Sequence, residues 1–171
     1  MKIFALLVAF IATNLTPNLC AIDGIPERKY LLNSYYNPNR LVFRLSKYSF
    51  ECSMLGASVP YFSAKNPCNS EKFAKISHLT IGYMQNNLNL EQMYSVRVVN
   101  GYCLVAYSNV VLNEKMVADG FAVVNKDGAE AFNNGLYLQK LRQMQSIAKA
   151  QKLGLWNSFY DEMQCFSESY K

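Results

Sequence analysis

Residues 94–124 read YSVRVVNGYCLVAYSNVVLNEKMVADGFAVV, and this stretch decides the fold. Two apolar segments flank Asn100-Gly101, a dipeptide that readily takes the two positive-φ positions of a type I′ turn. From Asn113 onward the pattern changes to that of a short helix, which Asn113 is expected to cap and Gly120 to end. The stretch therefore predicts a strand, a tight turn, a second strand and a short helix.

The bulk composition indicates one folded domain. The chain has 171 residues, and 51% of them are hydrophobic, so it is long enough and apolar enough to build a core. This composition excludes a disordered or low-complexity chain. The net charge of +5 permits an anionic partner but does not by itself indicate one, because nucleic-acid-binding domains cluster their charge on one face.

The N-terminus has the pattern of a secretory signal peptide. Met1-Lys2 precedes an apolar run from Ile3 to Ala12, and a small residue, Ala21, follows at a suitable distance. The run is short for a membrane span. We expect residues 1–21 to be removed and the chain to be exported, either secreted or periplasmic, in preference to an uncleaved anchor or a buried apolar segment.

Removal of Cys20 with the signal peptide leaves four cysteines: Cys52, Cys68, Cys103 and Cys165. An even number in an exported chain suggests up to two disulfides, for which the sequence leaves three connectivities open. In a reducing compartment the same residues would be buried free thiols. The chain has no Cys-x-x-Cys pair and a single histidine, His78, so a zinc site is not expected.

Further elements flank the opening stretch on both sides. Strands are predicted over 29–36, 40–45 and 50–55, with a turn at 37–39 between the first two. A helix capped by Asn69 or Ser70 follows, then the opening stretch, a polar loop over 125–134 and a long helix over 136–153 that Gly154 stops. Residues 22–159 are expected to form one domain, with 160–171 as a C-terminal tail.

The order of these elements is that of a five-stranded Greek-key barrel of the OB-fold type with three helices, an α+β fold. Three segments carry a more specific resemblance: NEKMVADGFA at 113–122, Ala148-Lys149, and Gly154-Leu155-Trp156. They resemble the C-terminal half of the staphylococcal-nuclease-like (thermonuclease) family. MLGASVP at 54–60 is similar to the family's third strand and the loop after it. The resemblance runs from about Lys29 to Phe159.

The resemblance implies a nuclease that cleaves phosphodiesters in DNA and RNA with calcium. Such a site needs carboxylates for the metal, a glutamate to activate water and two arginines to bind phosphate. The family motif Arg-Leu-x-Gly-x-Asp-x-Pro-Glu aligns with residues 53–61 of this chain. It places Ser53 at the first arginine, Ser58 at a metal-binding aspartate and Tyr61 at the glutamate. A second metal-binding aspartate falls near Asn39, and the second arginine falls at Tyr102.

These substitutions lead us to expect the family's fold without its catalytic residues and without a metal. Serine and asparagine are poor replacements for carboxylates around calcium, and tyrosine, with an ordinary pKa near 10, cannot replace a carboxylate base. A relocated site would have to use Arg40, Glu51, His78 or other scattered charges. Glu51 has no companion carboxylate in the sequence around it, which leaves too few ligands for a metal-assisted site.

We therefore expect an exported binding module. Its cleft would be formed by Ser53, Ser58, Tyr61, Tyr102, Arg44 and Arg97, and would bind nucleic acid, glycan or protein. One alternative is a divergent, calcium-dependent nuclease. Another is a structural subunit of an envelope assembly, with Tyr35, Tyr36 and Tyr48 exposed. In this barrel type the third and fifth strands are neighbours, which implies a Cys52–Cys103 disulfide and leaves Cys68 to pair with Cys165.

Overall fold

A computed structural model describes residues 28–61, 68, 71–130 and 135–170 of the chain. The expected signal peptide, residues 1–21, and the expected helix caps Asn69 and Ser70 lie outside these ranges. Within the described ranges no helix has both the length and the hydropathy needed to cross a membrane.

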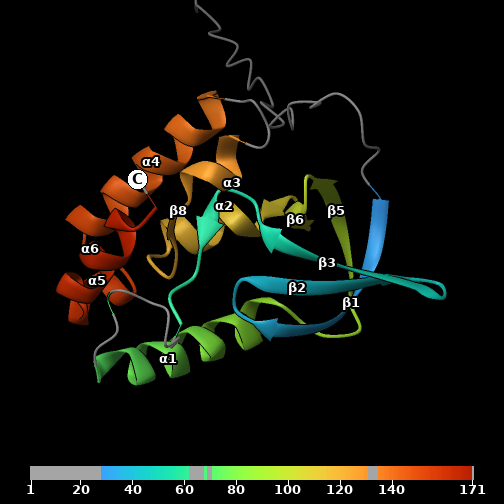
Figure 1. Cartoon of the computed structure of the whole chain (residues 1–171), viewed down its shortest axis with the longest axis horizontal. Coiled ribbons are helices and arrows are strands. Elements are labelled where there is room, and N and C mark those ends of the chain that lie inside the picture. The colour runs from blue at the N-terminus through green and yellow to red at the C-terminus, as the bar shows by residue number, and fades with distance from the viewer. Residues whose placement is uncertain (1–27, 62–67, 69–70, 131–134, 171) are drawn as a thin grey trace, which may run out of the picture.

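Five strands form a closed barrel, as the sequence predicts (Figure 1). They are β1 (Arg28–Asn37), β2 (Arg40–Leu45), β3 (Tyr48–Met54), β5 (Met93–Val99) and β6 (Tyr102–Tyr107). Antiparallel pairing runs in the order β3-β2-β1-β5-β6, and a short parallel pairing of β3 with β6 closes the ring. The parallel contact joins Ser53 to Tyr102 and Met54 to Cys103, so it brings two expected site residues together.

Tight turns set the register of the barrel. Asn100 and Gly101 both have positive φ, 49° and 79°, which confirms the predicted hairpin between β5 and β6. The β1–β2 hairpin ends with Asn37 opposite Arg40, next to an irregularity in the β1 register that begins at Tyr35. Such an irregularity increases the local bend and twist of a strand, and this one lies at the end of the hairpin that reaches the candidate site described below.

Short strands and, within the described ranges, six helices complete the structure. The strands are β4 (Ala57–Ser58), which pairs with β8 (Val123–Val124), and β7 (Val110–Val111), which extends the barrel sheet beside β6. The helices are α1 (Lys72–Asn87), α2 (Leu112–Ala118), α3 (Lys126–Glu130), α4 (Gly135–Ala150), α5 (Leu155–Ser158) and α6 (Tyr160–Glu168). Among them, α1, α2 and α4 correspond to the three helices expected from the sequence.

The expected loop and tail are wrong in part, because both contain helices. Residues 126–130, expected in a polar loop, form α3, and the Asn125 Oδ1 accepts a hydrogen bond from the Gly128 N–H in its first turn. Residues 160–168, expected in a C-terminal tail, form α6, which buries Met163 and Phe166. The tail expectation fails because these side chains pack into the domain, so α6 belongs to the same folded unit.

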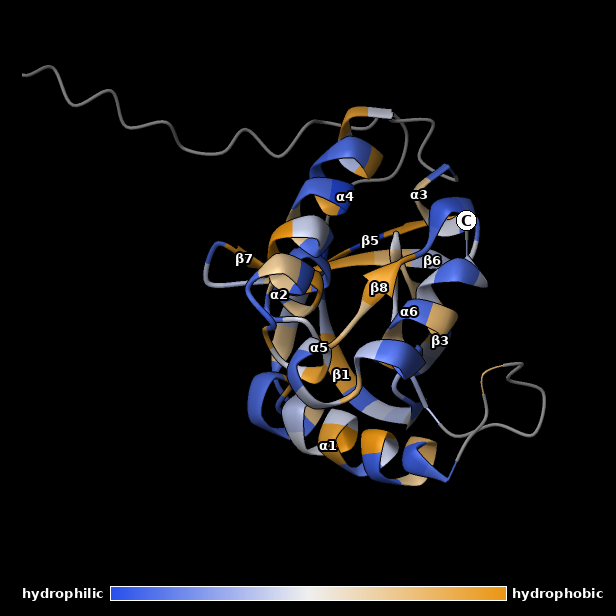
Figure 2. Ribbon diagram, turned by 90° about the vertical axis from the view of Figure 1, so that its left-hand side faces the viewer, coloured by the Kyte–Doolittle hydropathy of each residue, from blue (hydrophilic) through white to orange (hydrophobic). Residues whose placement is uncertain are grey.

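Two apolar clusters hold the helices and the barrel together. The first fills the barrel and includes Leu41, Phe43, Val96 and Val105, while the second lies between α1, α5 and α6 and contains Trp156. Figure 2 shows hydrophobic residues on β5, β6 and β8 in the interior and hydrophilic residues along the outer sides of the helices. Helix α1 buries Phe73, Ile76, Thr80 and Met84, which recur at helical spacing along one side of the helix.

Asn113 is a buried bridge and not the predicted helix cap. Helix α2 begins one residue earlier, at Leu112, and Asn113 has no exposed surface. Its Oδ1 accepts from the Val105 N–H at 2.9 Å, and its Nδ2 donates to the Leu55 and Cys103 carbonyls at 3.0 and 2.9 Å. The side chain therefore satisfies buried backbone groups at the end of β3 and in β6, which explains why an amide stands at this position.

Both disulfides expected from the barrel type are present. Cys52 in β3 is bonded to Cys103 in β6, beside the parallel pairing that closes the barrel. Cys68, shortly before α1, is bonded to Cys165 in α6. Disulfides of this kind are typical of proteins that fold outside the reducing cytosol.

Candidate binding pocket at the former nuclease site

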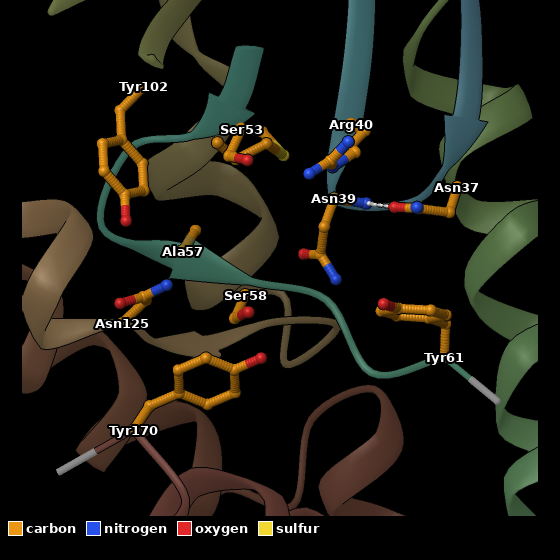
Figure 3. A pocket seen from close by; sticks show the side chains of 11 residues that line it. Asn37, Asn39, Arg40, Ser53, Ala57, Ser58, Tyr61, Tyr102, Asn125 and Tyr170 are labelled. Carbon is orange, nitrogen blue, oxygen red and sulfur yellow. Dashed lines mark hydrogen bonds between the residues drawn. The ribbon is translucent and has the colours of Figure 1, made fainter. Parts of the chain in front are cut away.

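One end of the barrel opens into a cavity of about 200 Å³. The β1–β2 turn, the end of β3, β4 and the start of β6 all reach it, and the C-terminal segment closes one side (Figure 3). It is lined by Asn37, Asn39, Arg40, Ser53, Met54, Ala57, Ser58, Tyr61, Tyr102, Asn125 and Tyr170. Eight of these eleven side chains are tyrosine, asparagine or serine, so the lining is rich in groups that both donate and accept hydrogen bonds.

The structure brings together the five residues that the family motif singled out. Ser53, Ser58, Tyr61, Tyr102 and Asn39 all line the cavity, although they come from three separate stretches of the chain, at 39, 53–61 and 102. Figure 3 shows Tyr102 and Tyr61 on different sides of the same space, with Ser58 between them.

Arg44 and Arg97, which were expected in the same cleft, are not among the residues that line this cavity. Arg44 lies in β2 opposite Ser49, towards the other end of the hairpin from Arg40, and contacts Glu91 at 3.4 Å. Arg97 lies in the middle of β5, opposite Leu104. Strand alternation predicts which face a side chain takes, but it does not predict which end of the barrel that side chain reaches.

Asn39 stands where the family has a metal-binding aspartate, and both the oxygen and the nitrogen of its side-chain amide make hydrogen bonds. The Asn39 Oδ1 accepts from the Val59 N–H at 2.6 Å, and the Asn39 Nδ2 donates to the Val59 carbonyl at 2.7 Å. The Asn39 N–H in turn donates to the Asn37 Oδ1 at 2.9 Å. A carboxylate could accept the first of these bonds but could not donate the second, so this position fits an amide.

The position of Tyr102 is supported by close packing from α3. A Cβ atom added to Gly128 would lie 3.0 Å from both the Tyr102 Cε1 and the Gly56 N. A side chain at residue 128 would therefore crowd the Gly56 backbone and the Tyr102 ring, and the absence of one lets α3 approach β6 and the turn before β4 this closely. This approach holds the Tyr102 ring at the edge of the cavity.

Charge at the cavity is nearly balanced. Arg40 alone carries a charge among the described lining residues, and its Nη1 lies 2.7 Å from the Glu51 Oε1. Both partners are partly exposed, so solvent screens the pair and it adds little stability. An anionic ligand would have to compete with Glu51 for the one guanidinium.

The calcium ion that the family implies does not fit these residues. Calcium usually takes six to eight oxygen ligands, with carboxylates among them. The lining offers amides, hydroxyls and one guanidinium, and the Asn39 Oδ1 already accepts a backbone hydrogen bond. Across the described ranges no three His, Cys, Asp or Glu side chains gather as a metal site would require.

Sequence reasoning gave no role in the pocket to four polar lining residues: Asn37, Arg40, Asn125 and Tyr170. Asn37 and Arg40 flank the β1–β2 turn. Because they are close neighbours of Asn39 in the sequence, they could have been predicted to line the same pocket. Asn125 precedes a helix that the sequence did not predict. Tyr170 follows α6, and the sequence offers no local signal that it returns to the barrel.

The family assignment follows from a comparison with protein-family models. The model described as staphylococcal nuclease homologue matches residues 64–158, more than half of the chain. The chain belongs to this family. The match confirms the expected resemblance and agrees with the closed barrel and its helices. A search of curated proteins returned no match.

The family match covers only part of the pocket. Tyr102 and Asn125 lie within the matched range of the staphylococcal nuclease homologue, whereas residues 37–61 precede it and Tyr170 follows it. The pocket of this family member therefore combines the matched region with walls that come from both ends of the described chain.

Proposed function

We propose that this protein is an exported member of the staphylococcal nuclease homologue family that binds a neutral glycan in the barrel-end pocket and does not cleave nucleic acid. The observation that supports this proposal is the lining of the pocket, which consists mainly of tyrosine, asparagine and serine with one ion-paired arginine. The two disulfides and the signal-peptide pattern of residues 1–21 support export.

The absence of cleavage is inferred from what the reaction requires. Calcium-assisted hydrolysis needs carboxylate ligands, a base for the attacking water and cationic donors for the charge that develops on phosphate. At the corresponding positions this chain has Asn39 and Ser58 for the metal ligands, Tyr61 for the base, and Ser53 and Tyr102 for the arginines. Loss of a single charge-stabilising donor typically costs about a hundredfold to a thousandfold in rate, and here both are replaced.

A glycan suits the pocket better than a nucleic acid for reasons of charge. Affinity for nucleic acid comes largely from lysine and arginine contacts to phosphate. Among the described lining residues the pocket offers Arg40 as its one cation, and Glu51 lies 2.7 Å from it. Amide and hydroxyl groups, by contrast, match the hydroxyl groups of a sugar, because both donate and accept.

Shape and precedent also favour a sugar. A cavity of about 200 Å³ accommodates one ring-sized group and leaves the rest of an oligomer outside. Tyrosine rings offer flat apolar faces for the C–H face of a sugar ring, with a hydroxyl at the edge. Barrels of the OB-fold type bind oligosaccharides as well as oligonucleotides.

Cleavage is tested first, with the chain from residue 22 onward, oxidised and purified. Single-stranded DNA and RNA are incubated with it in calcium and, in parallel, in EDTA. We expect no difference between the two conditions and no products above the buffer control. Robust cleavage that EDTA abolishes would overturn the proposal and identify a divergent nuclease.

Binding is tested by calorimetry with four probes: maltohexaose, cellohexaose, the hexamer of N-acetylglucosamine, and hexathymidylate. We expect at least one of the sugars to bind, with an affinity that EDTA and added salt leave nearly unchanged. The variant Tyr61→Ala should weaken this binding, whereas Tyr48→Ala should not, because Tyr48 is 71% exposed and lies at the β2–β3 turn. If no sugar binds, or if hexathymidylate binds more tightly than all three, the glycan assignment is wrong.

A further inference from the structure

The last described residue of the chain forms one wall of the pocket. Tyr170 follows α6 and lies beyond residues 64–158, the range matched by the family model. Figure 3 shows its ring beside Ser58 and below Asn125, with the hydroxyl directed across the cavity. A segment outside the matched family region therefore adds a third tyrosine to Tyr61 and Tyr102.

Aromatic contacts hold Tyr170 against α6. Its ring packs edge to face on Phe166, with centroids 5.1 Å apart, and Phe166 is itself buried. The Phe166 ring contacts Phe73 at the start of α1, with centroids 6.3 Å apart. The position of Tyr170 therefore depends on where α6 lies relative to α1.

Covalent and polar contacts fix α6 relative to α1 and α4. The Cys68–Cys165 disulfide joins the segment before α1 to α6. Beside it, the Lys72 Nζ lies 2.9 Å from the Glu162 Oε1, and the Glu162 side chain is only 10% exposed. On the other side of α6, the Gln145 Nε2 of α4 donates to the Ser167 Oγ at 3.1 Å.

The two disulfides differ in their access to solvent. Cys52 and Cys103 are 2% and 0% exposed and lie inside the barrel core. Cys68 is 9% exposed, and Cys165, in α6, is exposed to solvent. A reductant attacks a disulfide at a sulfur that it can reach, so the Cys68–Cys165 bond is the reducible one.

We propose that Tyr170 contacts the ligand of this pocket and that the Cys68–Cys165 disulfide holds it in place, so that reduction of this disulfide lowers ligand affinity. This inference rests on the proposed function. A dithiol reductant supplies two electrons and two protons, which convert the disulfide to two thiols while the reductant becomes a cyclic disulfide. Helix α6 then keeps only its noncovalent contacts, and the Tyr170 ring loses its fixed place at the pocket.

The test compares affinities for whichever of maltohexaose, cellohexaose and the N-acetylglucosamine hexamer binds the wild-type chain best. Tyr170→Ala should weaken binding by roughly tenfold, the loss expected when one aromatic contact to a ligand is removed. Tyr160→Ala is the matched control and should change affinity less than about twofold. Tyr160 lies on the same helix and is 43% exposed, but it packs on Trp156 and does not line the cavity.

The disulfide is tested with Cys68→Ser/Cys165→Ser, which should lose affinity to a similar extent. The triple variant that also carries Tyr170→Ala should lose little more, because both changes remove one interaction. Circular dichroism and urea unfolding establish that each variant is folded, and Tyr170→Phe should keep most of the affinity. If Tyr170→Ala or the double serine variant binds as tightly as wild type, the inference is wrong although the proposed function stands. If the wild-type chain binds none of the three sugars, the proposed function itself fails.

Discussion

Asn39 offers the sharpest test of why the pocket does not accept a metal. The variant Asn39→Asp restores the family's carboxylate at this position. It keeps the acceptor for the Val59 N–H but replaces the donor to the Val59 carbonyl with a carboxylate oxygen. Val59 is fully buried, so its carbonyl has little access to water as a substitute partner. An unsatisfied buried acceptor costs about 1–3 kcal/mol, and we expect a loss of free energy of unfolding in that range.

The loss is measured by urea unfolding, followed by the fluorescence of Trp156, the single tryptophan of the chain, which is 1% exposed. With an m value of about 2 kcal/mol per molar urea, a loss of about 2 kcal/mol lowers the midpoint by about 1 M. Asn109→Asp is the control, because it makes the same chemical change at an exposed turn residue. It should shift the midpoint very little.

A second measurement adds 10 mM calcium to both variants. A site with a dissociation constant of about 1 mM would raise the free energy of unfolding by about 1.4 kcal/mol at this concentration. We expect no such rise in Asn39→Asp, because the other lining residues that the structure describes supply no second carboxylate. An Asn39→Asp variant as stable as wild type, or one that calcium restores to wild-type stability, would refute the role assigned to the Asn39 amide.

Three further predictions concern the frame around the pocket. Asn113→Ala leaves the Val105 N–H and the Leu55 carbonyl without their amide partner and should lower the free energy of unfolding by about 2–6 kcal/mol; a loss below about 1 kcal/mol in urea unfolding would contradict the bridging role. Gly120→Ala should lower the free energy of unfolding by about 1–3 kcal/mol more than Gly101→Ala does. Both glycines have positive φ, but only at Gly120 would the new Cβ meet backbone, 2.3 Å from the Leu153 O. Equal losses of free energy in the two variants would exclude the clash. Partial burial tends to raise the pKa of Glu162, but the hydrogen bond and charge of Lys72 outweigh it and hold that pKa below its ordinary value of 4.5. The Lys72–Glu162 pair therefore stabilises the fold above pH 4.5, and this stabilisation disappears as the pH falls through the lowered pKa of Glu162 in the folded protein. Glu162→Gln lacks this titration and should lose less stability than wild type between pH 7 and pH 3. Parallel profiles of melting temperature against pH for the two proteins would argue against this role.

Features encoded by neighbouring residues were predictable from the sequence. The Asn100-Gly101 turn needs only two residues with positive φ, and the structure confirms both. The buried stripe of α1 follows from helical spacing alone. The Cys52–Cys103 pair followed from the barrel type, which places the third strand next to the fifth, and the Cys68–Cys165 pair was the one that remained. These features depend on local geometry or on a fold whose strand order is fixed.

Features that depend on distant contacts were not predictable in the same way. Asparagine suits a helix cap and a buried bridge equally well, and only the positions of β3 and β6 decide that Asn113 is the bridge. Helix α3 forms where Gly128 packs against Gly56 and Tyr102, which are remote in sequence. Helix α6 is short, and its place is determined by Phe73 and by the bond to Cys68 rather than by its own helix propensity.

The candidate site shows the same division. The five residues that the family motif singled out line one cavity because strand order carries them to one end of the barrel. The motif could not place Tyr170, which lies after a helix that the sequence did not indicate. It also could not exclude Arg44 and Arg97, since alternation along a strand does not distinguish the two ends of a barrel.

The arrangement of the two disulfides has a consequence for how the chain reaches its oxidised form. Cys68 lies between Cys52 and Cys103 in sequence, so the two covalent loops overlap. In an unfolded chain the probability that a loop closes falls with the three-halves power of its length. The non-native loop between Cys52 and Cys68, roughly 16 positions long, therefore closes about sixfold more readily than the native loop of 51 positions between Cys52 and Cys103. Random oxidation would therefore favour a mispaired product. Correct pairing requires that the reduced chain first bring β3 and β6 together, or that a disulfide isomerase correct the early bonds.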